Sequence, residues 1–246
     1  MLLVLAVSLA ATAKPPSFLT SAVSDPARPA EDRGRDAERK PAQTLDFAGL
    51  RPGMKVAELI PGGGYFTRVL SLAVGPSGHL YAVAPAKPAD APADAPDRSA
   101  AARAVAADAH FANVSVLAQP MRALDLPRNL DLVFTAQNYH DLHNAQGLDL
   151  RAFNKAVFDA LKPGGVYLVI DHEAQTGSGA RDTSTLHRIE SQTVIDEASA
   201  AGFKLDGQSE LLHEPADTHT LKVFDPQVRG KTDQFLLKFR KPKTVH

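Results

Sequence analysis

The chain has 246 residues, of which 44% are hydrophobic and 22% are charged. This composition excludes a wholly disordered chain and is sufficient for a sizeable core. Lys and Arg total 27 and Asp and Glu total 28, so the basic excess of a dedicated nucleic-acid binder is missing. The absence of Cys excludes disulfides, thiolate nucleophiles and Cys-ligated metal centres. No apolar stretch approaches the ~20 residues of a membrane-spanning helix.

The chain begins with an uncharged apolar run, residues 1–13, that ends in Ala-Thr-Ala. A short apolar region followed by an A-x-A site is typical of a secretory signal peptide, so we expect export to the periplasm. The alternative interpretation of this run is a buried N-terminal strand. Residues 14–40 are rich in Pro, Ala, Asp and Arg and predict a spacer. We therefore expect one domain over residues 41–246.

From residue 40 onward, short apolar runs alternate with amphipathic segments, which predict buried strands and helices respectively. The predicted strands are 54–60, 80–83, 114–117, 130–135 and 166–171, and the predicted helices are 65–74, 98–111, 150–161 and 193–201. Residues 203–212 and 233–240 then predict an antiparallel pair of strands. Apolar strands that alternate with helices predict a Rossmann-like, doubly wound α/β sheet of seven mostly parallel strands.

The first predicted strand is followed by the turn Pro61-Gly62-Gly63-Gly64-Tyr65. Three residues without a Cβ atom let the backbone approach a ligand closely, and the helix that follows offers free amide donors to an anion. In a doubly wound sheet, ligands bind beyond the carboxyl ends of the strands. The turn therefore predicts a binding site for a ligand that has a carboxylate or a phosphate.

Four segments carry a family resemblance: residues 56–65, 75–83, 130–134 and 161–169. Together they resemble class I S-adenosylmethionine (SAM)-dependent methyltransferases. Residues 56–65, followed by 75–83, resemble the first motifs of that family. Residues 130–134 resemble its fourth strand, and residues 161–169 resemble its helix-to-fifth-strand segment. The Pro-Gly-Gly-Gly-Tyr variant and the apolar leader are most similar to a group of exported bacterial predicted methyltransferases. The resemblance covers roughly residues 40–241 and implies a SAM cofactor and methyl transfer to a small-molecule acceptor.

The resemblance assigns expected roles to residues of the turn. It implies that Glu58 lies at the end of the first strand and orients the turn near the methionine end of SAM. Gly62 and Gly64 match two glycines of the family motif. Ile60 stands where the first glycine is expected, which predicts a turn of different shape.

Two further positions concern the nucleoside end of SAM. Ala84 stands where the family usually has an acidic residue that holds the ribose hydroxyls. Gln119 or Met121 occupies the region where an Asp often contacts adenine, and a Gln amide can still hydrogen-bond an adenine edge. The expected cofactor-binding residues are Glu58, Pro61, Gly62, Gly63, Gly64, Tyr65, Gln119 and Asn138.

Histidines and carboxylates follow the fourth and fifth predicted strands, in residues 137–143 and 171–173. In methyl transfer the protein aligns nucleophile, methyl group and sulfur, and it can remove a proton from the acceptor. Because histidine titrates at ~6.5, His140 or His172 is a candidate base. Asp141 or Asp171 is the candidate group that orients it.

Residues 176–182 are rich in Gly and Ser and predict a lid, and residues 185–190 predict a helix with His187 and Glu190 on one face. A second interpretation of this edge is a metal site. Its spacing matches no HExxH-type signature, so the main interpretation contains no metal. The candidate ligands, all imidazoles or carboxylates, are His140, His143, His172, Glu173 and His187.

Two hypotheses therefore stand. The first is a SAM-dependent methyltransferase that acts on an unidentified small molecule, with no nucleic-acid partner and no stable membrane insertion. The alternative is an exported Rossmann-like protein that binds another ligand or a metal, as a hydrolase or a non-enzymatic binder. Ala84 favours the alternative because the acid that usually holds the ribose is missing. The leader favours it because SAM is made in the cytosol. The glycine turn and residues 162–169 favour the first.

Overall fold

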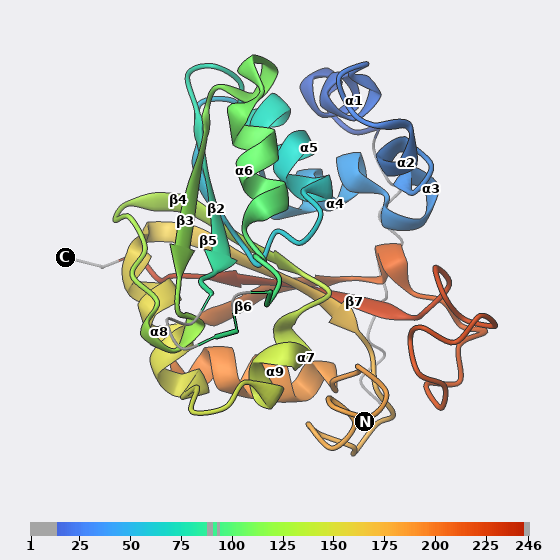
Figure 1. Cartoon of the computed structure of the whole chain (residues 1–246). Coiled ribbons are helices and arrows are strands. Elements are labelled where there is room, and N and C mark those ends of the chain that lie inside the picture. Colours follow the sequence, from blue (N-terminus) through green and yellow to red (C-terminus); the bar gives the residue numbers. More distant parts are fainter. Residues whose placement is uncertain (1–13, 88–90, 93, 244–246) are drawn as a thin grey trace, which may run out of the picture.

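A computed structural model describes residues 14–87, 91–92 and 94–243. The expected leader, residues 1–13, lies outside the described residues. The chain forms a three-layer α/β structure in which helices cover both faces of one seven-stranded sheet (Figure 1). None of the helices in these described ranges has the length and apolar character needed to span a bilayer.

The sheet contains β1 (Lys55–Leu59), β2 (His79–Pro85), β3 (Val114–Gln119), β4 (Leu130–Ala136), β5 (Leu161–His172), β6 (Lys204–Ser209) and β7 (Gln234–Arg240). Their order in the sheet is β3-β2-β1-β4-β5-β7-β6. Strands β1 to β5 are parallel to one another, and β7 pairs antiparallel with both β5 and β6. The predicted mostly parallel sheet with a C-terminal antiparallel pair is thereby confirmed.

The central strands place alternate side chains in two apolar cores, one on each face of the sheet. Along β4, Leu132 and Phe134 belong to one core and Val133 to the other. Both faces are buried, as the continuous apolar runs predicted. The helices over the first core are α4 (Pro41–Ala48), α5 (Tyr65–Val74) and α6 (Ala100–Ala107), and those over the second are α7 (Tyr139–Asn144), α8 (Leu150–Ala160) and α9 (Ser191–Ala200).

The segment 14–40, which we expected to be a spacer, instead contains three helices. They are α1 (Ser17–Ser24), α2 (Ala30–Arg33) and α3 (Asp36–Arg39). Leu19 of α1 is fully buried in the core that α5 covers. Pro16 and Pro29 directly precede α1 and α2. Proline has no backbone N–H to satisfy, so here it marks helix starts rather than an extended chain. The segment is thus part of the folded domain.

Residues 185–190 do not form the predicted helix. They follow a series of turns, and His187 has a left-handed backbone conformation with φ +57°. His187 and Glu190 consequently have different contacts: His187 lies beside His140, and Glu190 contacts the loop that precedes it. The carboxylate of Glu190 accepts the backbone N–H groups of Gly177 and Gly179, each at 2.8 Å, and so fixes the Gly- and Ser-rich loop.

Candidate functional site

The turn after β1 contains three residues with left-handed backbone conformations. Ile60, Gly62 and Gly64 have φ values of +53°, +55° and +83°. A β-branched residue seldom adopts this conformation, so Ile60 holds, at a cost on the order of 1–3 kcal/mol, a conformation that glycine would adopt without strain. Asn138 supports the turn, because its Nδ2 donates to the Ile60 carbonyl at 3.2 Å. Its side chain therefore contacts the turn backbone, and it would act on a ligand through that backbone.

The turn borders a cavity of about 420 Å³. A Cβ atom added at Gly62 or Gly63 would meet no atom within 4 Å, so the turn presents bare backbone to open space. The rest of the cavity wall is rich in charged side chains, and of these the sequence predicted only Glu58 as a binding residue. The charged residues are Glu31, Asp32, Arg35 and Arg39 of the N-terminal segment and Glu58 of β1.

Arg39 is the most desolvated cation of this wall. Its guanidinium lies over the ring of Tyr65, with Cζ 4.6 Å from the ring centroid, and donates to Oε1 of Gln137 at 2.6 Å. Burial, together with the nearby Arg35, lowers the pKa of Arg39 to about 10, so it remains a cation at neutral pH. A partly desolvated guanidinium is a strong donor to a carboxylate.

Glu58 lies at the end of β1, as the resemblance implied, and is 3% exposed. Burial raises the pKa of its carboxyl to about 8, although Thr67 donates to it at 2.6 Å and Arg39 attracts its charge. The group is therefore mostly protonated at pH 7. A cation bound beside it would favour the ionised form.

A second hollow, of about 310 Å³, also borders this turn: Ile60 and Gly62 line it, and Gly62 lines both hollows. Ala84 is fully buried and offers no polar group there. The acidic residue at this hollow is Asp97, from the loop after β2. Its Oδ1 accepts the backbone N–H of Ser99 at 2.9 Å and the Ser99 hydroxyl at 2.7 Å, and these bonds lower the pKa of Asp97.

Gln119, the expected adenine contact, lies at the end of β3 and borders neither hollow. Its Nε2 donates to the Asp125 carbonyl at 3.0 Å, and its Oε1 accepts the Asp125 N–H at 2.8 Å. Both ends of the amide thus hold the loop after β3.

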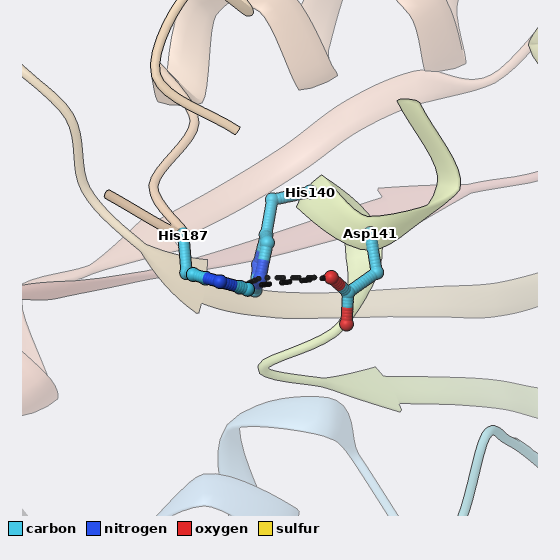
Figure 2. Close-up of side chains that lie close together, drawn as sticks. All are labelled: His140, Asp141 and His187. Carbon is cyan, nitrogen blue, oxygen red and sulfur yellow. Dashed lines mark hydrogen bonds and ion pairs between the residues drawn. The ribbon is translucent and has the colours of Figure 1, made fainter. Parts of the chain in front are cut away.

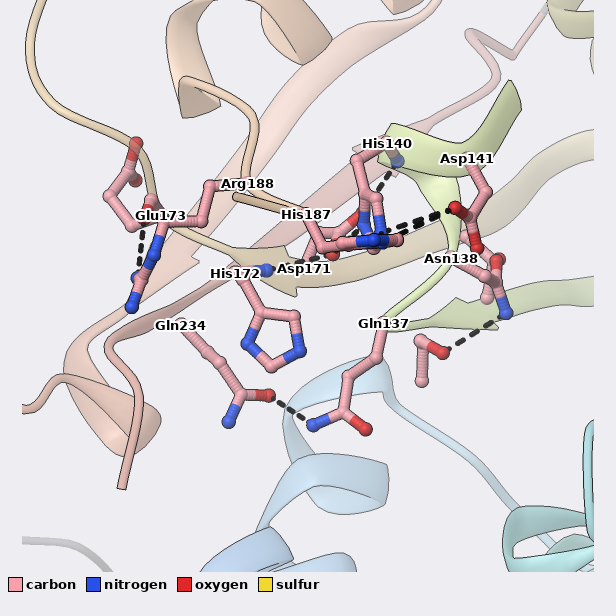
Figure 3. A network of polar contacts seen from close by, with 12 residues as sticks. Gln137, Asn138, His140, Asp141, Asp171, His172, Glu173, His187, Arg188 and Gln234 are labelled. Carbon is pink, nitrogen blue, oxygen red and sulfur yellow. Dashed lines mark hydrogen bonds and ion pairs between the residues drawn. The ribbon is translucent and has the colours of Figure 1, made fainter. Parts of the chain in front are cut away.

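The carboxyl ends of β4 and β5 bring a histidine cluster together (Figure 3). Asp171 is fully buried, and its carboxylate accepts Nδ1–H of His140 at 2.8 Å. Of the two acids that the sequence offered as orienting groups, Asp171 holds this position. Asp141 instead lies on the opposite edge of the imidazole, 3.4 Å from Nε2 (Figure 2). Burial lowers the pKa of His140, but the Asp171 and Asp141 carboxylates outweigh it and raise the pKa above its usual range.

His172 has a different environment from His140. Its ring centroid lies 6.3 Å from that of His140, and its Nδ1 shares a hydrogen bond of 2.8 Å with the hydroxyl of Thr232. Burial lowers the pKa of His172 to about 4, so its imidazole is neutral at pH 7. His140 is consequently the more basic of the two predicted bases.

The five candidate metal ligands do not all converge. His143 lies 3.3 Å from a carboxylate oxygen of Glu197, and Glu173 accepts the backbone N–H of Ser191 at 2.9 Å. Only His140 and His187 approach each other, with Nε2 and Nδ1 3.3 Å apart. Asp141 joins them, which the sequence did not predict, because this depends on the non-helical backbone at His187.

No family model and no curated protein matches the sequence. Solved structures do match the fold. A SAM-dependent methyltransferase from Aquifex aeolicus is 20% identical, with a TM-score of 0.62 over 86% of this chain and 95% of that chain. The [4+2]-cyclase SpnF is 18% identical, with a TM-score of 0.59 over 87% and 82%. A possible exported protein from Bordetella parapertussis is 16% identical, with a TM-score of 0.52 over 85% and 68%. The chain therefore has the class I methyltransferase fold, as its motifs predicted.

Proposed function

We propose that the chain binds SAM across the glycine turn and transfers its methyl group to a small-molecule acceptor. The observation that supports this most directly is the pair of hollows that meet at Gly62. SAM has two polar ends joined at a sulfonium, so a two-part site that shares a bare turn matches its shape. The fold supports the proposal as an analogy only, because one fold hosts many reactions.

The charged cavity suits the amino-acid end of SAM. The carboxylate of the ligand would pair with Arg39, and its ammonium would lie near Glu58, which would ionise on binding. The nucleoside would occupy the second hollow, where Asp97 replaces the acid that is missing at Ala84. A carboxylate can accept hydrogen bonds from both ribose hydroxyls, and Arg103, which pairs with Oδ2 of Asp97, would move aside for them.

In the transfer step, a lone pair of the acceptor forms a bond to the methyl carbon while the carbon–sulfur bond breaks and its electrons return to sulfur. The protein's main contribution is the alignment of these three atoms. An acceptor O–H or N–H must also release a proton. The roles of His140, His172 and Asp141 in that release stay predictions, and the raised pKa favours His140 over His172.

Calorimetry with SAM and its demethylated product S-adenosylhomocysteine tests the proposal. Gly63 has open space at its Cβ position and no left-handed φ, so Gly63→Leu should fold normally while its side chain enters the cavity. We expect at least a tenfold loss of affinity in Gly63→Leu. The matched control is Ala104→Leu on the exposed side of α6, which should bind like the unmodified chain.

The absence of heat with either ligand at millimolar concentration would overturn the proposal and favour the alternative of another ligand in this fold. An equal loss of affinity in both variants would show that the turn is not the binding site.

We also propose that residues 1–13 direct export and are removed after Ala13. Mass spectrometry of the protein recovered from a periplasmic fraction should then find Lys14 as the first residue. An intact leader on protein that is found only in the cytosolic fraction would contradict this.

A further inference from the structure

Three side chains at the edge formed by β4 and β5 direct electron-pair donors at one point (Figure 2). The atoms are Nε2 of His140, Oδ1 of Asp141 and Nδ1 of His187. Within the described ranges, no other group of three His, Cys, Asp or Glu residues brings its ligand atoms this close together. We propose that these residues bind a divalent transition-metal ion of the zinc type.

The spacing of the three atoms fits a tetrahedral ion. His140 Nε2 lies 3.3 Å from His187 Nδ1 and 3.4 Å from Asp141 Oδ1, and the last two atoms lie 3.8 Å apart. Zinc binds imidazole nitrogen at ~2.0–2.1 Å, so two ligand atoms of a tetrahedral site lie ~3.3–3.4 Å apart. Two edges already have this length, and the third requires a shift of a few tenths of an ångström.

His140 is oriented as metal-binding histidines usually are. Its Nδ1–H donates to the buried carboxylate of Asp171, which fixes the tautomer and leaves the lone pair of Nε2 directed at the other two atoms. The backbone N–H of His140 also donates to Asp171, at 2.7 Å, so ring and main chain are held by the same carboxylate. Two such bonds leave the imidazole little freedom to turn away.

His187 is held from the opposite side by its neighbour in the chain. Arg188 is fully buried, pairs with Asp217 at 2.8 Å and donates to the Glu173 carbonyl at 3.0 Å. The ring of Phe224 lies 4.9 Å from that of His187, centroid to centroid. The left-handed backbone at His187 is thus kept in place, and its imidazole points toward His140 rather than into solvent (Figure 2).

The other histidine–carboxylate cluster differs in a way that makes it a useful control. His213 and His219 each contact a different oxygen of Asp233, at 3.0 and 2.9 Å. Nδ1 of His213 and Nε2 of His219 therefore each face their own carboxylate oxygen, and the two nitrogens do not point at a common position. His219→Ala therefore removes a comparable imidazole from a site that we expect to bind no metal.

Three protein ligands leave a fourth position for water or a substrate oxygen, as in catalytic zinc sites. Asp141 is half exposed, so that position is accessible from solvent. The metal proposal does not rest on the proposed methyl transfer, and it assigns Nε2 of His140 to the metal instead of to a proton.

The experiment uses the full chain, first stripped with a chelator and then titrated with ZnCl₂ by calorimetry and with CoCl₂ by absorption spectroscopy, without SAM. We expect one equivalent of either ion and the intense visible bands of four-coordinate Co²⁺. His187→Ala and Asp141→Asn should each weaken binding at least tenfold, and Asp171→Asn by about 10–100-fold. His219→Ala should bind like the unmodified chain.

Circular dichroism of the same variants shows whether each one is folded, and the exposure of Asp141 keeps Asp141→Asn informative even if another variant unfolds. Failure of the unmodified chain to bind either ion would overturn the proposal. So would unchanged stoichiometry and affinity in both His187→Ala and Asp141→Asn, which would place the ion elsewhere. In either case, Nε2 of His140 would remain free to accept a proton.

Discussion

The carboxylate of Asp171 accepts two hydrogen bonds from His140, one from the ring at 2.8 Å and one from the main chain at 2.7 Å. These bonds join the end of β5 to the first turn of α7 and determine where the imidazole lies. Both side chains are almost completely removed from solvent. A buried pair of this kind is sensitive to the loss of one partner, because the other then remains buried without compensation.

We therefore expect Asp171→Asn to lower the free energy of unfolding by about 3 kcal/mol. Asp141→Asn is the matched control, since Asp141 touches the same imidazole but is half exposed; its loss should stay below about 1 kcal/mol. Urea denaturation of the two variants measures the difference. Equal losses would show that the buried contact has no special weight.

Glu58 predicts a pH dependence of stability that a neutral variant removes. Its pKa is about 8 in the folded chain against 4.5 ordinarily, so the folded state holds a proton that the unfolded state releases above pH 4.5. The contribution of the protonated Glu58 side chain to the free energy of unfolding is fully present below pH 4.5 and is lost as the pH rises toward 8. The slope is at most about 1.4 kcal/mol per pH unit.

Glu58→Gln has no such proton, and its amide oxygen can still accept the Thr67 hydroxyl. The stability of Glu58→Gln relative to the unmodified chain should therefore increase with pH between 4.5 and 8. Urea denaturation at several pH values measures this difference, in which other titrating groups cancel. Parallel pH profiles for the two proteins would contradict the raised pKa of Glu58.

The sequence predicted the sheet well because each strand is marked by a short apolar run of its own residues. The run 130–135 is apolar on both faces, and the structure buries Val133 and Phe134 in opposite cores. The glycine turn was also a local signal, because three glycines between an apolar run and an amphipathic run predict exposed backbone, and the structure has open space at Gly62 and Gly63. The predicted helices 65–74 and 150–161 are present within one residue of their expected ends.

The parts that depend on long-range contacts were not predictable in the same way. Residues 14–40 resemble a spacer in composition, and only their packing on α5 shows that Arg39 borders the cavity. The helix predicted around His187 fails because buried Arg188 pairs with Asp217, 29 residues away. The loop that contains Asp97 shows no local sign that it brings a carboxylate to the second hollow.

Leu19 tests whether the N-terminal helices belong to the domain. Its side chain is fully buried in the core beneath α5, so Leu19→Ala removes apolar contacts and leaves a cavity. We expect a loss of about 3 kcal/mol in the free energy of unfolding. Phe18→Ala is a less buried comparison from the same helix and should cost less. A single urea transition that is unaffected by Leu19→Ala would show that α1 is not part of the cooperative unit.

Arg39 should recognise the amino-acid end of SAM specifically. Arg39→Met keeps an apolar chain over the Tyr65 ring but removes the guanidinium. We expect S-adenosylhomocysteine to bind about tenfold more weakly to this variant, because a charge-assisted hydrogen bond contributes ~1.5–3 kcal/mol. 5′-Methylthioadenosine, which lacks the carboxylate and the ammonium, should bind with unchanged affinity. Calorimetry with both ligands measures the two effects, and equal losses would place Arg39 outside the carboxylate site.

Asp97 should give the complementary result, because it borders the second hollow, where we propose that the nucleoside binds. In Asp97→Asn the carboxylate is lost but the side-chain shape is retained, and Ser99 can still donate to the amide oxygen. Both S-adenosylhomocysteine and 5′-methylthioadenosine contain the ribose hydroxyls, so we expect both to bind several-fold more weakly. A 2′-deoxy analogue has lost one of those hydroxyls, and its affinity should therefore fall less in the variant than that of the ribose form. If the substitution weakens the binding of the ribose form and the 2′-deoxy analogue equally, Asp97 does not contact the ribose. The acid missing at Ala84 would then have no replacement in this loop.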